Sequence, residues 1–208
     1  MFFVFDGPDG GGKTTQISLF VQWLRGEGLD VVACRDPGST PLGEAIRALL
    51  LNPEGVPIGR RSEMLLYMAA RAQMVDERIL PALAEGKTVV SDRYLLANVV
   101  YQGYAGGLDP ELIRTIGAAA TSGCRPNLTI VLDVSTASAA ARFSRPLDRM
   151  ERESERFREA VRQGYLELAR LHPAEIQVVD ADRPPEQVQE DVRRVAQRVL
   201  QAGGKAPA

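Results

Sequence analysis

The feature that most constrains this chain is a glycine-rich stretch close to its N-terminus. Residues 7–14 read GPDGGGKT and fit the pattern G-x-x-x-x-G-K-[ST]. An apolar run precedes them, and a pattern of helical length follows. In this context the glycines let successive backbone N–H groups converge on one point, where the helix N-terminus adds positive charge. The sequence therefore predicts a phosphate-binding loop (P-loop) between a strand and a helix.

The side chains of this loop have expected tasks. Lys13 can reach the β- and γ-phosphates of a nucleotide, and the Thr14 hydroxyl can ligate Mg²⁺. A glycine-rich turn that contains Lys-Thr by chance is the alternative, and the flanking strand and helix argue against it. A GTPase would also carry an N-K-x-D motif, which this chain does not contain. The expected ATP-binding residues are Gly7, Pro8, Asp9, Gly10, Gly11, Gly12, Lys13, Thr14 and Thr15.

The rest of the chain alternates short apolar runs with longer helical patterns. Nearly unbroken hydrophobicity is typical of parallel strands that are covered on both faces. The predicted strands are 2–6, 30–34, 88–92, 128–133 and 176–180. The predicted helices are 13–26, 41–51, 60–84, 110–122, 135–142, 151–171 and 184–202. This alternation predicts an α/β P-loop NTPase fold, a five-stranded parallel sheet flanked by helices, in a single domain over residues 1–208.

One stretch interrupts the alternation. Pro146 lies between two helical patterns and should break the helix. We expect a short lid over about residues 143–151, and an ordinary turn between helices is the alternative. Arg145 and Arg149 are the candidate lid arginines, and the tail over 203–208 is expected to fray.

Composition limits the partners. A formal net charge of −2 argues against a broad nucleic-acid footprint. No run approaches the roughly 18 apolar residues of a membrane span, and no basic segment follows Met1. Cys34 and Cys124 fit no metal-ligand spacing and are expected to stay reduced. We therefore expect a cytoplasmic protein that binds neither nucleic acid nor membrane.

A carboxylate is expected beside the P-loop. The predicted strand 88–92 ends in Asp92, which parallel topology would bring to the carboxyl edge of the sheet. Asp92 suits a metal-site acid that contacts Mg²⁺ through water. Its alternative role is to cap the following helix.

Two side-chain clusters suggest a second substrate. If the segment after Asp92 is helical, then Asn98, Tyr101 and Gln102 fall at i, i+3 and i+4 and share one face. Tyr67 and Arg71 lie at i and i+4 of the predicted helix 60–84. An aromatic ring beside a guanidinium suits a nucleobase with carbonyl groups, although each cluster could also be a solvated surface.

Taken in order, these motifs resemble those of the bacterial thymidylate kinases over nearly the whole chain. The matching stretches are DGPDGGGKTTQ at 6–16, RDPGST at 35–40, YMAARAQ at 67–73, DRY at 92–94, YQG at 101–103, LDV at 132–134, DRME at 148–151 and GYLEL at 164–168. The sequence departs from the family pattern at Asp36, Ser39, Tyr67 and Ala97-Asn98. The resemblance therefore does not specify the details of the base contacts, although it does specify the reaction.

The resemblance implies an activity and a partner set. It implies phosphorylation of dTMP to dTDP by ATP in dTTP synthesis, with Mg²⁺ as cofactor and a homodimeric assembly. A kinase for another nucleoside monophosphate or deoxynucleoside remains an alternative, as does a regulatory P-loop ATPase.

The resemblance also implies roles for particular residues. Lys13, Arg93 and Asp9 would be catalytic, together with Arg145 or Arg149 of the lid. Asp9 would lie near the deoxyribose 3′-hydroxyl and the metal, and Arg35 and Arg93 would hold the acceptor phosphate. For the nucleoside it implies that Tyr67 stacks on thymine, Arg71 donates to its O4, Asn98 and Gln102 read the base edge, and Tyr101 disfavours ribose.

Overall fold

The computed structural model describes residues 1–142 and 146–203. Arg145, the start of the predicted lid and residues 204–208 of the predicted frayed tail lie outside the described residues.

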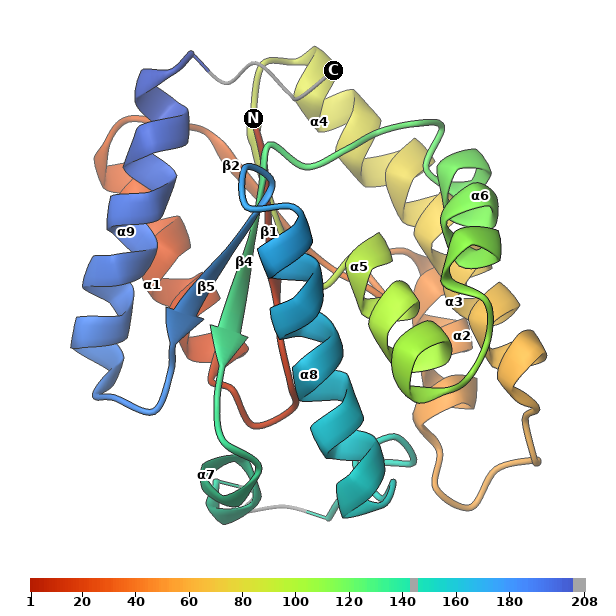
Figure 1. The fold of residues 1–208 in the computed structure, drawn as a ribbon. Coiled ribbons are helices and arrows are strands. Elements are labelled where there is room, and N and C mark those ends of the chain that lie inside the picture. The colour runs from red at the N-terminus through yellow and green to blue at the C-terminus, as the bar shows by residue number, and fades with distance from the viewer. Residues whose placement is uncertain (143–145, 204–208) are drawn as a thin grey trace.

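A five-stranded parallel sheet lies at the centre of the molecule (Figure 1). The strands are β1 (Phe2–Asp6), β2 (Val31–Arg35), β3 (Thr88–Asp92), β4 (Leu128–Asp133) and β5 (Ile176–Asp180). Their order is β2-β3-β1-β4-β5, and every neighbouring pair is parallel. The three inner strands are buried almost throughout, whereas the edge strands β2 and β5 are partly exposed. The predicted fold class is confirmed, and β2 begins one residue later than predicted.

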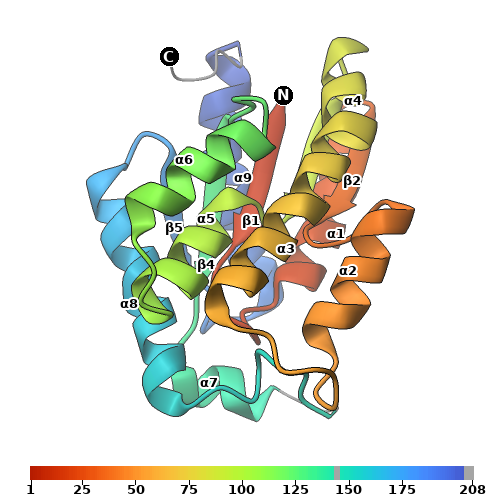
Figure 2. The ribbon, with the colours of Figure 1, turned by 90° about the vertical axis from the view of Figure 1, so that its right-hand side faces the viewer.

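Helices cover both faces of this sheet (Figures 1 and 2). On one face α1 (Lys13–Gly26) and α9 (Pro185–Gln201) bury residues such as Phe20 and Val192 against β1 and β4. The other face is covered by further helices, among which α3, α6 and α8 contribute apolar side chains to a second core. The remaining elements are α2 (Pro41–Leu51), α3 (Arg60–Met74), η1 (Val75–Ile79), α4 (Leu80–Ala84), α5 (Leu95–Asn98), η2 (Val99–Ala105), α6 (Pro110–Ala120), α7 (Thr136–Ala141) and α8 (Glu155–Leu171).

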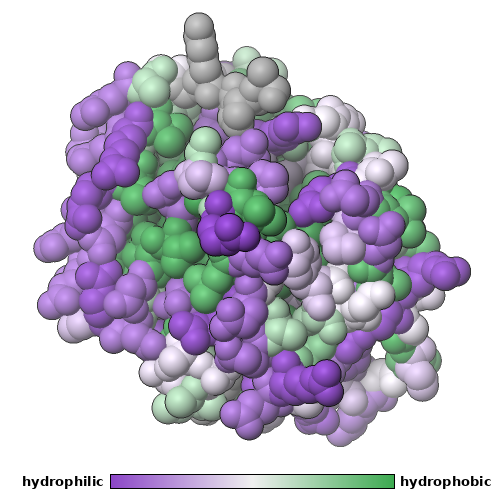
Figure 3. Space-filling model, in the orientation of Figure 1, coloured by the Kyte–Doolittle hydropathy of each residue, from purple (hydrophilic) through white to green (hydrophobic). Residues whose placement is uncertain are grey.

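The face of the molecule that Figure 3 shows is mostly polar. Figure 3 shows hydrophilic residues over much of one side, with hydrophobic residues in smaller areas between them. None of the described helices has the length and apolar character that crossing a bilayer requires.

The predicted helix 60–84 changes its hydrogen-bond register on the way. It divides into α3, the π-helical η1 and α4. Pro81 has no N–H to donate to the carbonyl of Glu77, and the N–H of Leu80 bonds instead to Val75, five residues back. The segment after Asp92 behaves similarly, because α5 continues directly into the π-helical η2.

The largest boundary error concerns the predicted helix 151–171, which begins only at Glu155. The Ser154 hydroxyl accepts from the N–H of Phe157 and caps this later start. A separate turn precedes it, in which the Asp148 carboxylate accepts from the N–H groups of Met150 and Glu151. The Glu151 carboxylate in turn accepts from the N–H of Asp148 at 2.9 Å. The predicted helices 110–122, 135–142 and 184–202 are shorter by one or two residues at their ends.

Parallel topology brings the polar residues to one edge of the sheet. Phe5 of β1 pairs with Asp92 of β3, and Asp92 also pairs with Arg35 of β2. The loop after β1 therefore lies beside the segment that follows Asp92, at the carboxyl ends of the strands.

Candidate active site

The P-loop packs so tightly that two of its glycines are required. Gly7 has a φ of +123°, and a Cβ there would lie 2.5 Å from the carbonyl oxygen of Leu132. Gly10 has a φ of +79°, and its Cβ would lie 2.7 Å from the carbonyl oxygen of Ala139. Both positions combine a left-handed backbone with a neighbouring backbone that cannot move aside.

Lys13 curls back over the loop that precedes it. Its Nζ donates to the carbonyl oxygens of Pro8 at 2.8 Å and Gly7 at 3.1 Å, and it lies 4.0 Å from Asp9 Oδ1. Burial lowers the pKa of Lys13. The ammonium group is thus already at the point where phosphates would meet the loop.

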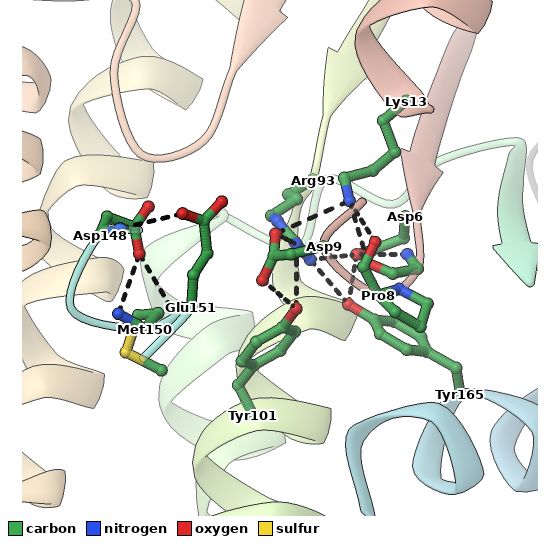
Figure 4. Close-up of polar contacts among 11 residues, drawn as sticks. Asp6, Pro8, Asp9, Lys13, Arg93, Tyr101, Asp148, Met150, Glu151 and Tyr165 are labelled. Atoms are coloured by element: carbon green, nitrogen blue, oxygen red, sulfur yellow. Dashed lines mark hydrogen bonds and ion pairs between the residues drawn. The ribbon is translucent and has the colours of Figure 1, made fainter. Parts of the chain in front are cut away.

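Arg93 connects the P-loop to the surrounding elements (Figure 4). Its Nη1 donates to Asp6 Oδ1 at 3.2 Å and to the Tyr165 hydroxyl at 3.0 Å. Its Nη2 donates to Asp9 Oδ1 at 2.6 Å and to the Tyr101 hydroxyl at 3.0 Å, and that hydroxyl donates to Asp9 Oδ2 at 2.8 Å. The backbone of Arg93 has a φ of +69°, a strained conformation of the kind that clusters at functional sites.

These contacts shift the pKa values of the two carboxyls in opposite directions. Burial alone would raise the pKa of Asp9, but the charges of Arg93 and Lys13 outweigh it and lower that pKa to about 2. Asp6 is buried more deeply, and burial raises its pKa despite the contact with Arg93. Asp9 is thus held as an anion beside two cations.

A cavity of about 360 Å³ lies over the P-loop. Thr14 and Asp92, the two residues predicted near the metal, both line it, and hydroxyl and carboxylate oxygens are the donors that Mg²⁺ prefers. Among the described residues no group of three or more His, Cys, Asp or Glu side chains could hold a metal ion by itself. The lining consists of Asp9, Gly10, Gly11, Gly12, Lys13, Thr14, Arg35, Asp36, Arg47, Asp92, Arg93, Arg142, Asp148 and Glu151.

A smaller cavity of about 90 Å³ adjoins the first. Asp9 and Arg93 line both, so they stand at the junction. The predicted base-contacting residues meet in the smaller cavity although they come from α3, α5 and η2. They are Tyr67, Arg71, Asn98, Tyr101 and Gln102.

Arg71 is fixed by its neighbours inside the smaller cavity. Its side chain is 1% exposed, its Nε donates to Asp36 Oδ2 at 2.5 Å, and its Nη2 donates to the Tyr94 carbonyl oxygen at 3.3 Å. Burial raises the pKa of Asp36, with Arg71 acting against it. Asp36, at which the sequence departs from the family pattern, therefore anchors the guanidinium that we expected to read the base.

Arg35 and Arg149 have contacts other than the expected ones, and three predicted ATP-binding residues, Gly7, Pro8 and Thr15, line neither cavity. Arg35 lines the larger cavity, but its guanidinium donates to both carboxylate oxygens of Glu44. Arg149 donates to the Leu50 carbonyl at 2.6 Å and to Glu63 at 2.5 Å, so it faces α3 rather than the P-loop. Thr15 is exposed at the start of α1 and, among the described residues, belongs to neither lining.

Sequence reasoning did not assign five charged residues of the two linings to the site, namely Asp36, Arg47, Arg142, Asp148 and Glu151. Arg47 and Asp148 line both cavities, and Arg142 lines the larger one and donates to the Gly10 carbonyl at 3.2 Å. Arg47 sits in an ordinary amphipathic helix and Arg142 at a helix end, where arginine is common. Asp148 and Glu151 lie in the motif DRME and Asp36 lies in RDPGST, and these motifs were the available signals.

The fold and the site together define a class of protein. A P-loop over one cavity, an arginine at the junction and a second cavity that combines apolar and polar side chains are the parts of a P-loop phosphotransferase with a small acceptor.

Comparison with known proteins narrows the class. The family model "Thymidylate kinase" matches residues 5–192. Thymidylate kinases from Symbiobacterium thermophilum and Pelotomaculum thermopropionicum are 46% and 45% identical, over 96% and 97% of this chain and 94% of each relative. The crystal structure of thymidylate kinase from Ehrlichia chaffeensis superposes with a TM-score of 0.75 at 30% identity, covering 94% of this chain and 98% of that one. The chain belongs to the thymidylate kinase family, whose activity is the ATP-dependent phosphorylation of dTMP to dTDP.

Proposed function

We propose that the two adjoining cavities divide the substrates of this reaction between them. The larger cavity takes the phosphates of ATP on the P-loop, and the smaller one takes the nucleoside of dTMP. The observation that carries the proposal is the position of Arg93, which lines both cavities and lies within 2.6 Å of Asp9 of the P-loop. A cation there can contact the acceptor phosphate and the transferring phosphoryl group together.

The chemistry needs positioning and charge rather than a strong base. An oxygen of the acceptor phosphate is already an anion when it attacks the γ-phosphorus in line, and ADP leaves. Lys13 and Arg93 hold the phosphates and offset the charge of the transition state, and Arg142 is near enough to the loop to assist. Mg²⁺, when bound with ATP, would neutralise phosphate charge from the side of Thr14 and Asp92.

In the smaller cavity each side chain suits one part of thymidine. Tyr67 provides a ring for stacking, and Arg71 provides donors for a carbonyl such as O4. The amides of Asn98 and Gln102 line the cavity where the base edge would lie. The Tyr101 hydroxyl, fixed between Asp9 and Arg93, crowds the sugar. These roles fit dTMP better than a monophosphate with a 4-amino base.

We also propose a cytoplasmic homodimer. The leucines Leu42 and Leu49 of α2, Leu65 of α3 and Leu112 of α6 are 41–49% exposed, on helices that lie side by side in Figure 2. Exposed leucines on neighbouring helices support an interface between copies. Unpaired Cys34 and Cys124 suit a reducing compartment.

An ADP-release assay with a panel of monophosphates tests the function. We expect turnover with dTMP to exceed that with dCMP, dAMP and dGMP, whereas a regulatory ATPase would ignore the panel. Lys13→Ala should lower kcat at least about 10²-fold in a folded protein. Lys87→Ala is the matched control, because Lys87 precedes β3 and pairs with Asp30 and Glu85, away from both cavities. Near-normal turnover in folded Lys13→Ala would contradict the assignment of the P-loop.

A further inference from the structure

A buried glutamate outside both cavity linings holds three donors together. Glu63 of α3 is 0% exposed. Its Oε1 accepts from Gln102 Nε2 at 2.8 Å and from Arg60 Nη1 at 3.3 Å. Its Oε2 accepts from Arg149 Nη2 at 2.5 Å. One carboxylate thus connects α3, η2 and the turn that carries Arg149.

This carboxylate determines how the neighbouring amides are oriented. A carboxylate between two guanidinium groups only accepts hydrogen bonds, so Gln102 must present its Nε2 to Glu63. Gln102 Oε1 then faces Asn98 and accepts from Asn98 Nδ2 at 2.8 Å. The orientation of both amides follows from the charge of Glu63 and not only from atom labels.

The hydrogen bonds from Glu63 through Gln102 to Asn98 form a relay, and one polar atom at its end has no hydrogen-bond partner within the described chain. Asn98 Oδ1 is buried and has no hydrogen-bond partner among the described residues. Buried acceptors are almost always paired in native proteins, so an unpaired one in a cavity lining indicates that a bound molecule provides the donor. The imide N3–H of thymine is such a donor, whereas cytosine has an acceptor at the same position.

We infer that Glu63 is a positioning residue for base selection. Acting through Gln102, it makes Asn98 present an acceptor instead of a donor to position 3 of the base. The inference rests on the base site proposed above and deepens it, because it assigns the choice of base to a carboxylate that does not touch the base.

The substitution Glu63→Gln tests the relay with almost no change of shape. The carbonyl oxygen of the introduced amide stays with Arg149, whose contact with Glu63 is shorter than that of Arg60, and its NH₂ group takes the place of Oε1 beside Gln102 and Arg60. Gln102 must then turn its oxygen toward the introduced amide and its NH₂ toward Asn98, so Asn98 presents Nδ2 to the cavity. We expect the ratio of kcat/KM for dTMP to that for 5-methyl-dCMP, which differs from dTMP only at positions 3 and 4, to fall about 10-fold or more.

Two features keep this experiment specific. Both substrates are assayed in one preparation, so the ratio does not depend on the fraction of folded enzyme. The control is Glu153→Gln, which removes the other carboxylate that pairs with Arg60 but lies outside the relay. It should leave the ratio unchanged.

The double variant Glu63→Gln with Gln102→Glu should restore the preference, because it exchanges the amide and the carboxylate. The NH₂ group introduced on α3 would donate to the carboxylate introduced on η2, and that carboxylate would again accept from Asn98 Nδ2. If Glu63→Gln does not fold, Gln102→Met cuts the relay and keeps Glu63 with both arginines, and it should also lower the ratio.

An unchanged ratio in both folded Glu63→Gln and folded Gln102→Met, or an equal loss for both substrates in both variants, overturns the inference. If Asn98→Ala still changes the ratio in that case, the base site stands and only the relay is wrong. A wild-type enzyme that prefers neither substrate overturns the base site itself.

Discussion

The buried pair of Arg71 and Asp36 limits how the base site can be probed. Their contact is 2.5 Å long, and each side chain is only 1% exposed. Removal of the arginine leaves a buried carboxylate without its cation, which is commonly strongly destabilising. An assay of Arg71 variants therefore has to compare substrates within one preparation.

We expect Arg71→Ala to lose at least about 10-fold of the preference for dTMP over dCMP. Arg71 has only donors, which suit O4 of thymine and oppose the 4-amino group of cytosine in a dry site. Tyr67→Ala should instead weaken the binding of both substrates alike, because every base has a π-face on which the ring can stack. The measurement is the ratio of kcat/KM values in wild type and both variants. A wild-type ratio in Arg71→Ala would show that this arginine does not read the base.

Asp9 gives a pH-dependent prediction for stability. Its pKa is about 2 in the folded protein against roughly 3.9 in an unfolded chain, so the carboxylate stabilises the fold above the unfolded value. We expect Asp9→Asn to lower the free energy of unfolding by roughly 2 kcal/mol at pH 6–7. Because protonation removes this contribution, the difference should shrink as the pH falls from about 5 toward 2.

Urea unfolding of both proteins at several pH values measures this difference. The exposed Asp76→Asn is a control that should show little change at any pH. A difference that stays constant down to pH 2.5 would contradict the role of Asp9 as a paired anion.

At the scale of elements, the two arginines on either side of Pro146 contact different parts of the site. Arg142 donates to the P-loop carbonyl of Gly10, whereas Arg149 donates to Glu63 and the Leu50 carbonyl. We expect Arg142→Ala to lower kcat about 10-fold or more with little change in ATP affinity, since it acts where charge develops.

Arg149→Ala should act on the acceptor instead. It loosens Glu63 and should raise KM for dTMP several-fold, while ATP binding is retained. ATP titration and steady-state kinetics with both substrates separate the two outcomes. A loss of kcat without a change in KM for dTMP would contradict this role and would instead support contact between Arg149 and the phosphates of ATP.

Periodicity predicted most elements, and local hydrogen bonding explains the exceptions. The apolar runs located all five strands within one residue because a doubly covered strand has no polar alternative. The start of α8 could not be predicted, because Ser154 and Asp148 are both competent caps and only the structure shows which one starts the helix.

The site was predictable where a motif concentrates chemistry, as in the P-loop, and less so where it depends on distant contacts. That Arg35 would pair with Glu44 depends on how α2 packs, which the motif around Arg35 does not specify. Glu63 was not singled out, because a glutamate in the first turn of a helix is common on exposed surfaces.

At the scale of the whole molecule, the leucines on α2, α3 and α6 predict assembly. We expect a mass of about twice the 22.7 kDa chain by light scattering. Leu65→Glu, which places a charge on α3, should shift the mass toward one chain while the fold is kept. Val178→Glu is the matched control, because Val178 is similarly exposed but lies on β5. A monomeric wild-type protein at micromolar concentration would contradict the proposed dimer.

The four contacts of Arg93 have a consequence for the rate at which ATP is hydrolysed without dTMP. A bare cation beside the γ-phosphate would also favour attack by water, and each such event would discard ATP without product. Asp6 and Asp9 both accept hydrogen bonds from the Arg93 guanidinium, so an acceptor phosphate must compete with these two carboxylates for it. We therefore expect Asp9→Asn to raise ATP hydrolysis measured without dTMP relative to its dTMP-dependent turnover. On this expectation, binding of dTMP would displace the two carboxylates from Arg93 and so couple ATP hydrolysis to the presence of the acceptor.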